Sequence, residues 1–170
     1  MTGLIIVGGR VDIKDVKAFI GKLSALGREC NVTVQAMNAD RIAGRGHIEF
    51  AANKAVEAFK NKENLARDLG METMLYLRGK RQIEKALELG VREGMNAVAI
   101  VIIGDDPGCA EDKARAVLDV VDGKVVDYSH EKDETLMMLY DITPEEVAIA
   151  GRERIPLLVR ERSALLEFEK

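Results

Sequence analysis

The stretch NAVAIVII, residues 96–103, decides the fold that we expect from this sequence. It is continuously apolar after Asn96 and rich in β-branched residues, which is typical of a strand covered on both faces. We therefore place it at the centre of a sheet. Three more strands are predicted before it in the chain. They are the apolar run 4–7, the alternating residues 32–37 and residues 71–77.

Helices are expected between and after these strands. The clearest covers residues 46–60, where apolar residues recur at i, i+3, i+4, i+7, i+8 and i+11. The others are expected over residues 12–26, 64–69, 82–89, 110–121, 130–140, 144–150 and 155–167. This order predicts an α/β fold, a small sheet of about four strands packed against several helices. No linker or repeat divides the chain, so we expect a single domain over residues 1–170.

The composition is that of a globular protein, with 47% hydrophobic and 32% charged residues. No run approaches the roughly 18 apolar residues that a membrane-spanning helix needs, and the N-terminus does not resemble a signal peptide. We therefore expect a cytoplasmic protein without a membrane partner. Cys30 and Cys109 form neither a disulfide framework nor a metal-ligand spacing, so we expect structural thiols.

Charge is distributed unevenly along the chain, although the net charge is only −4. Residues 1–85 carry 15 basic against 10 acidic side chains, and residues 86–170 carry 10 against 19. This asymmetry suggests one electropositive and one acidic face, provided that the fold does not interleave the two halves. A mixed, solvated surface is the alternative.

The usual catalytic motifs are missing, so we expect no enzyme, no catalytic residue and no cofactor. Asp105 and Asp106 follow the central strand and suit a hard cation, but Asp-Asp-Pro-Gly is also ordinary turn chemistry, which we favour. No metal site is assigned.

Two expected helix starts carry cations where the helix dipole favours acidic residues. One is Arg41-Ile42-Ala43-Gly44-Arg45-Gly46-His47, and the other is Arg78-Gly79-Lys80-Arg81. Glycine, unpaired backbone N–H groups and basic side chains together bind phosphate. Neutralisation of these cations by neighbouring carboxylates as surface ion pairs is the alternative.

The basic span extends beyond these two starts. Residues 41–85 hold 10 basic against 6 acidic side chains, which favours contact with a nucleic-acid backbone over a small molecule. The competing hypothesis is a small phosphate- or nucleotide-binding enzyme that uses the starts at Arg45–His47 and Gly79–Arg81. Phe50 lies off the apolar stripe of its helix and is expected either to pack against a second element or to face a ligand.

Three segments carry a resemblance to a known family. They are NADRIAG with HIEFAA (residues 38–52), NLARDLGME (residues 64–72) and GKRQIEKAL (residues 79–87). In these segments the chain resembles the small kinase-binding subunit of the KEOPS complex. The resemblance implies a non-catalytic, regulatory subunit of the assembly that makes threonylcarbamoyl-adenosine in tRNA. It also implies two partners, an atypical kinase/ATPase subunit and the single-stranded CCA 3′ end of tRNA.

The resemblance further implies which residues bind tRNA. Leu77 and Arg78 stand where the family usually has two small residues, and Arg78 adds a possible phosphate contact. The implied tRNA site comprises Arg41, Gly44, Arg45, His47, Arg78, Gly79, Lys80, Arg81 and Gln82.

The C-terminal helix carries more apolar surface than its charged neighbours require. The resemblance suggests that it contributes to kinase docking, whereas closure of the protein's own core is the alternative. The candidate docking residues are Ile155, Leu158, Val159, Leu165 and Leu166, with Phe168 in the same segment.

Overall fold

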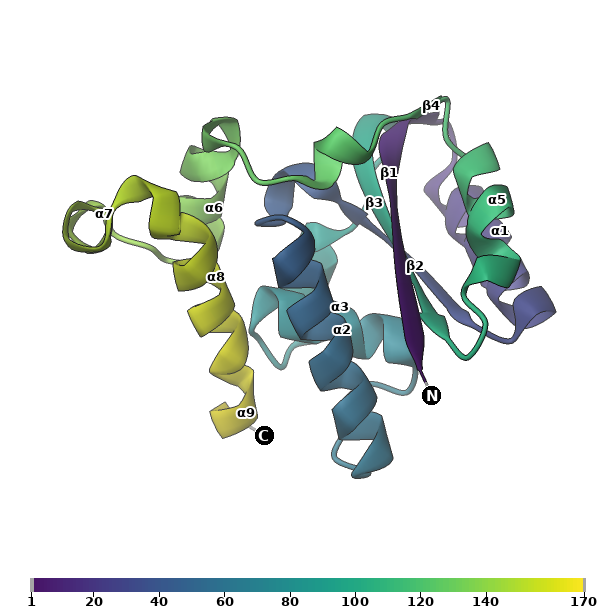
Figure 1. Ribbon diagram of the computed structural model, residues 1–170, viewed down its shortest axis with the longest axis horizontal. Helices are drawn as coiled ribbons and strands as arrows, with labels where there is room; N and C mark the ends of the chain where they lie inside the picture. The colour runs from purple at the N-terminus through teal and green to yellow at the C-terminus, as the bar shows by residue number, and fades with distance from the viewer. Residues whose placement is uncertain (1, 170) are drawn as a thin grey trace. The chain divides into compact units, whose positions relative to one another are not determined.

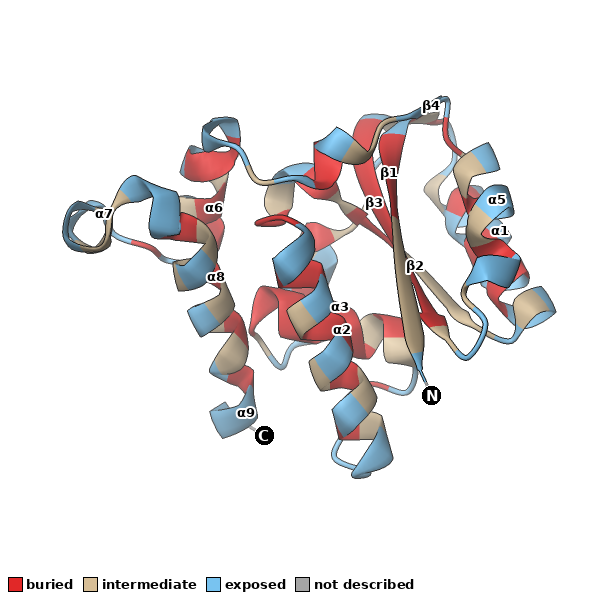
Figure 2. Ribbon diagram, viewed as in Figure 1, coloured by how far each residue is buried: buried red, intermediate tan, exposed pale blue. Residues whose placement is uncertain are grey.

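The computed structural model describes residues 2–169 and contains one four-stranded antiparallel sheet (Figure 1). The strands are β1 (Gly3–Ile13), β2 (Thr33–Asn38), β3 (Gly94–Gly104) and β4 (Val120–Val121), in the order β2-β3-β1-β4. The stretch 96–103 lies in β3, every residue of it is buried, and β3 pairs with β2 on one side and β1 on the other (Figure 2). The expected α/β class and the central position of this strand are confirmed.

Helices supply most of the remaining structure. The α-helices are α1 (Val16–Cys30), α2 (Arg45–Lys60), α3 (Leu69–Arg78), α4 (Ile83–Ala86), α5 (Gly108–Ala116), α6 (Asp133–Leu139), α7 (Pro144–Ala150), α8 (Ile155–Ala164) and α9 (Leu166–Glu169). Short 3-10 turns cover Ala39–Arg41, Leu87–Leu89, Gly123–Val126, His130–Lys132 and Arg152–Arg154. Within the described residues, no helix has the length and apolar character needed to cross a membrane.

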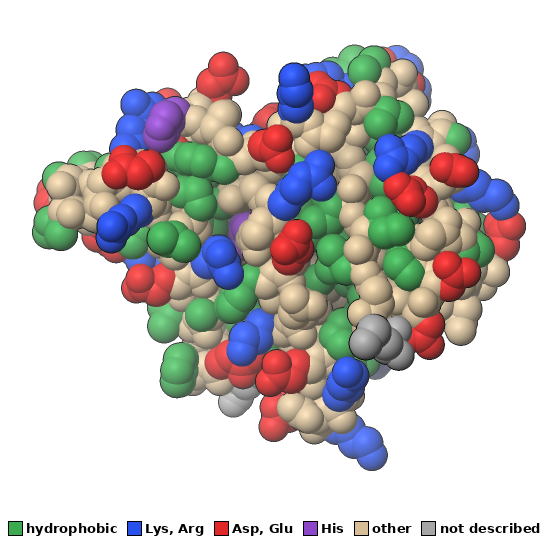
Figure 3. All heavy atoms as spheres, in the orientation of Figure 1, with side chains coloured by type: hydrophobic (Ala, Val, Ile, Leu, Met, Phe, Trp, Pro, Cys, Tyr) green, Lys and Arg blue, Asp and Glu red, His purple; other side chains and the backbone are tan. Residues whose placement is uncertain are grey.

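The chain divides into two compact units, each built from two separate segments. The sheet unit comprises residues 1–39 and 90–126, and the helical unit comprises residues 40–89 and 127–170. The fold therefore interleaves the basic and acidic halves of the sequence. By sequence, the sheet unit holds 9 basic against 10 acidic residues and the helical unit 16 against 19. The condition for one basic and one acidic face, that the fold keeps the two halves apart, is therefore not met. Figure 3 shows charges of both signs interspersed on the face in view.

In the sheet unit, α1 and α5 cover one face of the sheet (Figure 1). The helices and strands share one apolar core, because each contributes side chains at the spacing of its own period. The core includes Phe19, Leu23 and Leu26 of α1, Ala110 and Ala114 of α5, and Val7, Val98, Ile100 and Ile102 of the strands.

The expectation that Cys30 and Cys109 are structural thiols is wrong. Cys30 and Cys109 form a disulfide, with their Cα atoms 5.8 Å apart, inside the range that such a bond spans. The two cysteines are 79 positions apart in sequence, and only the packing of α1 on α5 brings them together. The positions of the two cysteines in the sequence do not reveal this pairing.

Residues 71–77 were expected to form a strand but belong to α3. The Asp68 side chain caps this helix by accepting a hydrogen bond from the Met71 N–H (2.8 Å). Eight of its ten residues are buried, with Glu72, Thr73 and Arg78 among them, so the helix has no exposed polar face and its sequence shows no helical stripe. A short apolar run of this kind does not distinguish a strand from a buried helix.

Two expected helices also need correction. Residues 64–68 are irregular, because the buried Glu72 carboxylate accepts hydrogen bonds from the N–H groups of Leu65 (2.9 Å) and Ala66 (2.7 Å). The helix expected over 110–121 ends at Ala116, and Val120–Val121 becomes the edge strand β4 instead. β4 approaches β1 so closely that a Cβ on Gly9 would lie 2.2 Å from the Val120 carbonyl oxygen.

Candidate functional site

The first basic segment leads into α2, as expected. Gly44 is the N-cap with φ +98°, a backbone conformation that favours glycine, and it caps the helix without a side-chain hydrogen bond. The first turn of α2 contains no acidic residue. Arg45 is exposed and its Nε lies 3.4 Å from Asp127 Oδ1, while the half-buried Arg41 donates from Nη1 to the Glu88 carbonyl (2.6 Å). α2 therefore begins with a partly neutralised cationic turn.

His47 is fully buried below this turn. Its Nδ1 accepts a hydrogen bond from the Ala43 N–H (3.1 Å), so the proton sits on Nε2, which donates to the Leu77 carbonyl (2.9 Å). Burial lowers the pKa of His47 to about 4, with a further contribution from the Arg160 charge, while the hydrogen bond to Leu77 opposes the shift. The ring is neutral at physiological pH and is out of reach of a ligand on the surface.

The second basic segment is the end of a helix rather than the start of one. α3 ends at Arg78, and Gly79 follows as a left-handed C-cap (φ +73°). A Cβ on Gly79 would lie 2.5 Å from the Arg162 carbonyl oxygen, so a larger residue does not fit here. Cations near a helix C-terminus are favoured by the dipole, and α4, which follows, has only four residues. The expectation of two reversed helix starts is therefore wrong for this segment.

Arg78 is part of the interior of the helical unit. Its side chain is only 8% exposed, its Nε donates to Glu88 Oε1 (3.0 Å), and its guanidinium lies 5.7 Å from the centroid of the Tyr140 ring. This is the neutralised arrangement that we weighed as the alternative for the basic segments. Arg78 is thus placed to support the site rather than to contact a surface ligand.

The structure nevertheless brings the two segments together. The His47 ring joins the first turn of α2 to the last turn of α3, and Ser163 of α8 donates to the same Leu77 carbonyl (2.9 Å). Around this junction, Arg45, Arg81 and Gln82 are exposed and Lys80 is half-buried. Neither Lys80 nor Arg81 forms an ion pair with a described residue. We call Arg45, Lys80, Arg81 and Gln82 the junction surface.

A cavity of about 340 Å³ opens beside the junction surface. It contains groups of both charges, and the guanidinium of Arg162 within it is already paired with the Glu146 carboxylate (2.6 Å). Its lining comprises Arg78, Gly79, Lys80, Tyr140, Asp141, Arg162, Leu165 and Glu169.

The C-terminal segment divides into an inner and an outer face. Ile155, Val159 and Leu166 are completely buried in the helical unit, so they pack α8 and α9 rather than form a docking surface. Leu158 is half-buried and Leu165 is 48% exposed. Two further apolar side chains of this segment are exposed, Leu157 (58%) and Phe168 (85%).

The surroundings of Phe50 of α2 fit both roles expected for it, packing against a second element and facing a ligand. Its ring is half-buried and is flanked by the guanidinium of Arg160 of α8 (5.4 Å to the ring centroid) and by the ammonium of Lys54 (5.9 Å). This packs α2 against α8, and the ring also borders a hollow of about 280 Å³. Both hypotheses for Phe50 therefore keep support.

No group of three or more His, Cys, Asp or Glu side chains within residues 2–169 is arranged to hold a metal ion. Asp105 and Asp106 are exposed in the turn between β3 and α5. Sequence reasoning missed Ser163 and Tyr140, whose hydroxyl donates to the Arg41 carbonyl (3.0 Å). Their partners are 86 and 99 positions away, so no local spacing could have indicated these roles.

Comparison with known families identifies the class of this protein. Residues 11–164 match the family of kinase binding proteins named CGI-121, and the chain belongs to that family. The match includes the junction surface and most of the C-terminal segment. No curated protein matches the chain.

Proposed function

We propose that this protein is a non-catalytic, regulatory subunit of the KEOPS tRNA-modification complex. In this role it binds the atypical kinase/ATPase subunit and recruits tRNA through the single-stranded CCA 3′ end. Its membership of a kinase-binding family over residues 11–164 carries the first half of the proposal. The junction surface supports the second half.

The kinase is proposed to dock on the outer face of the C-terminal segment. Leu157, Leu165 and Phe168 expose apolar side chains there, and burial of such side chains drives most protein association. The buried Ile155, Val159 and Leu166 hold this face in place. Leu158, half-buried between them, borders the proposed contact.

The RNA is proposed to bind at the junction surface. Arg45, Lys80 and Arg81 supply cations for phosphate, and the amide of Gln82 supplies donors and an acceptor for a base edge. Only a few cations are exposed there, so the footprint suits a short single strand better than a duplex. Arg41, Gly44, His47, Arg78 and Gly79 act as positioning residues, because they fix the ends of α2 and α3.

The competing hypothesis of a nucleotide-binding enzyme has less support. It requires two helix N-termini at one phosphate site, and only the segment before α2 provides one. We therefore propose no catalytic activity for the isolated chain.

The decisive experiment titrates the purified protein with full-length tRNA and with tRNA lacking the CCA tail. We expect tighter binding of the full-length molecule. The double variant Lys80→Glu/Arg81→Glu should weaken that binding roughly tenfold or more, because two phosphate contacts become repulsive.

The matched control is Lys17→Glu/Lys22→Glu, which makes the same change of charge at exposed positions of α1. It should leave tRNA affinity close to that of the unaltered protein. Equal affinity for intact and trimmed tRNA, or equal losses in both double variants, would reject recognition of the tail at the junction surface.

A further inference from the structure

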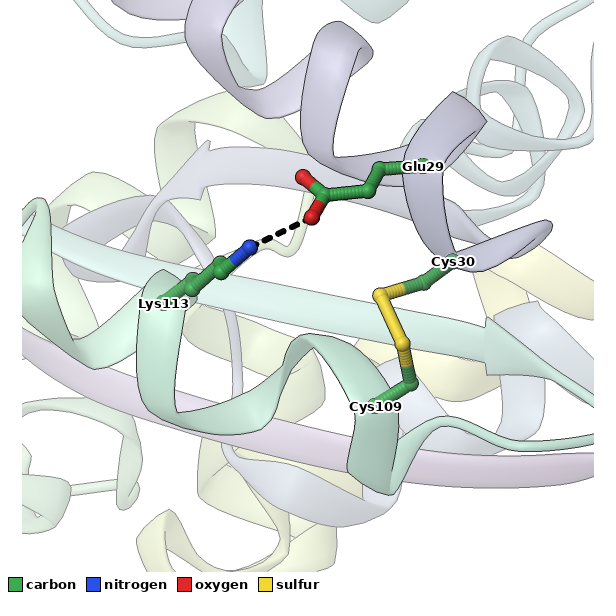
Figure 4. Close-up of a disulfide and its surroundings, with 4 residues drawn as sticks. All are labelled: Glu29, Cys30, Cys109 and Lys113. Atoms are coloured by element: carbon green, nitrogen blue, oxygen red, sulfur yellow. Dashed lines mark hydrogen bonds and ion pairs between the residues drawn. A yellow bond between two sulfur atoms is a disulfide. The ribbon is translucent and has the colours of Figure 1, made fainter.

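The sheet unit contains a covalent cross-link that the proposed function does not use. Cys30 is the last residue of α1, and Cys109 lies in the first turn of α5 (Figure 4). Their disulfide closes a chain segment of 79 residues, which contains all of residues 40–89 of the helical unit. The described residues contain no free cysteine.

The two helices are also held together without the disulfide. Lys113, one turn beyond Cys109, forms an ion pair with Glu29, the neighbour of Cys30 (Figure 4). Phe19, Leu23 and Leu26 of α1 share the apolar core with Ala110 and Ala114 of α5. Since this packing does not depend on the sulfur–sulfur bond, reduction leaves the two thiols facing one another, where the bond can form again.

The two sulfur atoms differ in environment. Cys109 is exposed and lies at the N-terminal, positive end of α5, which stabilises a thiolate. Cys30 is half-buried against the core at the negative end of α1. The neighbouring charges do not separate the two sulfur atoms, because Glu29 is paired with Lys113 and Glu111 lies in the first turn of α5 beside Cys109. Exposure does separate them, so Cys109 is the sulfur open to attack and the faster-reacting thiol after reduction.

We infer that Cys30–Cys109 is a reversible thiol–disulfide exchange site whose oxidation state sets the stability of the protein, with a dithiol as the reductant. A thiolate of the dithiol attacks the exposed Sγ of Cys109, the Sγ–Sγ bond breaks, and Cys30 departs as a thiolate that takes up a proton. The second thiolate of the dithiol then displaces Cys109 from the mixed disulfide, and Cys109 takes up the second proton. Two electrons pass to the cysteine pair, and the dithiol becomes a disulfide.

The size of the effect follows from the length of the closed loop. A cross-link restricts the unfolded chain more strongly as the loop lengthens. For a loop of this length in a chain of this size, reduction should lower Tm by roughly 10 °C.

The first test compares Tm of the oxidised protein, of the same protein after treatment with dithiothreitol, and of the double variant Cys30→Ser/Cys109→Ser. We expect the reduced protein and the double variant to melt at similar, lower temperatures, and dithiothreitol to leave the double variant unchanged. Removal of the reductant should restore the original Tm in a monomer. An unaltered Tm on reduction, or reoxidation to disulfide-linked dimers, would overturn the inference. Both measurements use the unaltered protein, so they do not require that a variant folds.

The second test separates the two thiols. The single variants Cys30→Ser and Cys109→Ser each keep one cysteine, and iodoacetamide modification of the folded protein is followed by mass. Cys109 should react several-fold faster than Cys30. The reverse order would contradict the assigned roles of the two sulfur atoms.

Discussion

His47 pairs two buried backbone groups with one neutral ring. It accepts from the Ala43 N–H ahead of α2, and it donates to the Leu77 carbonyl, which is one of the unpaired carbonyls at the end of α3. Ser163 donates to the same carbonyl from α8. Because all three groups are buried, the histidine must stay uncharged for the arrangement to persist.

The neutral histidine makes stability depend on pH. The pKa of His47 is about 4 in the folded protein and 6.5 in the unfolded chain, so between these values the unfolded chain binds more protons. We expect this group to leave stability unchanged above pH 6.5 and to remove on the order of 3 kcal/mol as the pH falls from 6.5 to 4. Urea unfolding at successive pH values measures this loss.

The variant His47→Gln provides the comparison, because its amide offers a donor and an acceptor but does not titrate. Its stability should be lower at pH 7 and should change less between pH 6.5 and 4 than that of the unaltered protein. Identical pH profiles for the two proteins would mean that another group carries the titration.

At the scale of elements, the sequence correctly predicted the helices and strands whose two faces differ in polarity. It also predicted the elements whose length alone separates a helix from a strand. The stripe of α2 and the cap at Thr143, whose hydroxyl accepts from the Glu146 N–H (3.1 Å), both gave correct helices. α3 was missed because it is buried on nearly every side. The Asp68 cap is a signal that would have located its start.

The same reasoning explains the outcome for the candidate site. Exposed cations such as Arg45 and Arg81 can be recognised in a sequence by residue type alone. The burial of Arg78 depends on Glu88 and Tyr140, and the burial of His47 depends on Leu77 and Ser163. These partners come from separate elements of the helical unit, so only the fold reveals that two of the predicted contacts are internal.

The outer face of α8 and α9 carries the prediction for kinase binding. Leu165 is half-exposed and its neighbour Leu166 is buried, so a charge at position 165 should disturb docking without opening the core. We expect Leu165→Glu to reduce affinity for the proposed kinase partner more than tenfold, while the free energy of unfolding changes by less than about 0.5 kcal/mol. Co-purification and calorimetric titration with the kinase measure the first effect, and urea unfolding measures the second.

Met95→Glu is the matched control, since Met95 is a similarly exposed apolar side chain of the sheet unit (68%). It should bind the kinase normally. Retention of full affinity by Leu165→Glu would remove this residue from the proposed docking face, and loss of binding by Met95→Glu would place the contact on the sheet unit.

At the scale of the whole molecule, the excess of basic residues in one half of the sequence and of acidic residues in the other does not produce one large basic and one large acidic surface. The chain passes between its two units at residues 39–40, 89–90 and 126–127, so each unit receives a basic and an acidic segment. Any attraction for RNA must therefore come from a few local cations rather than from a broad positive field.

This limits how strongly salt should affect tRNA binding. Arg45, Lys80 and Arg81 provide about three phosphate contacts, and each contact to a single strand releases roughly 0.7 of a counterion. The slope of log K against log salt should thus be about −2, a loss of roughly 20-fold in affinity between about 50 and 200 mM salt. Lys80→Glu/Arg81→Glu should flatten the slope by at least about 1.4. A slope near zero would exclude phosphate contact at the junction surface, and a much steeper one would require basic side chains beyond it.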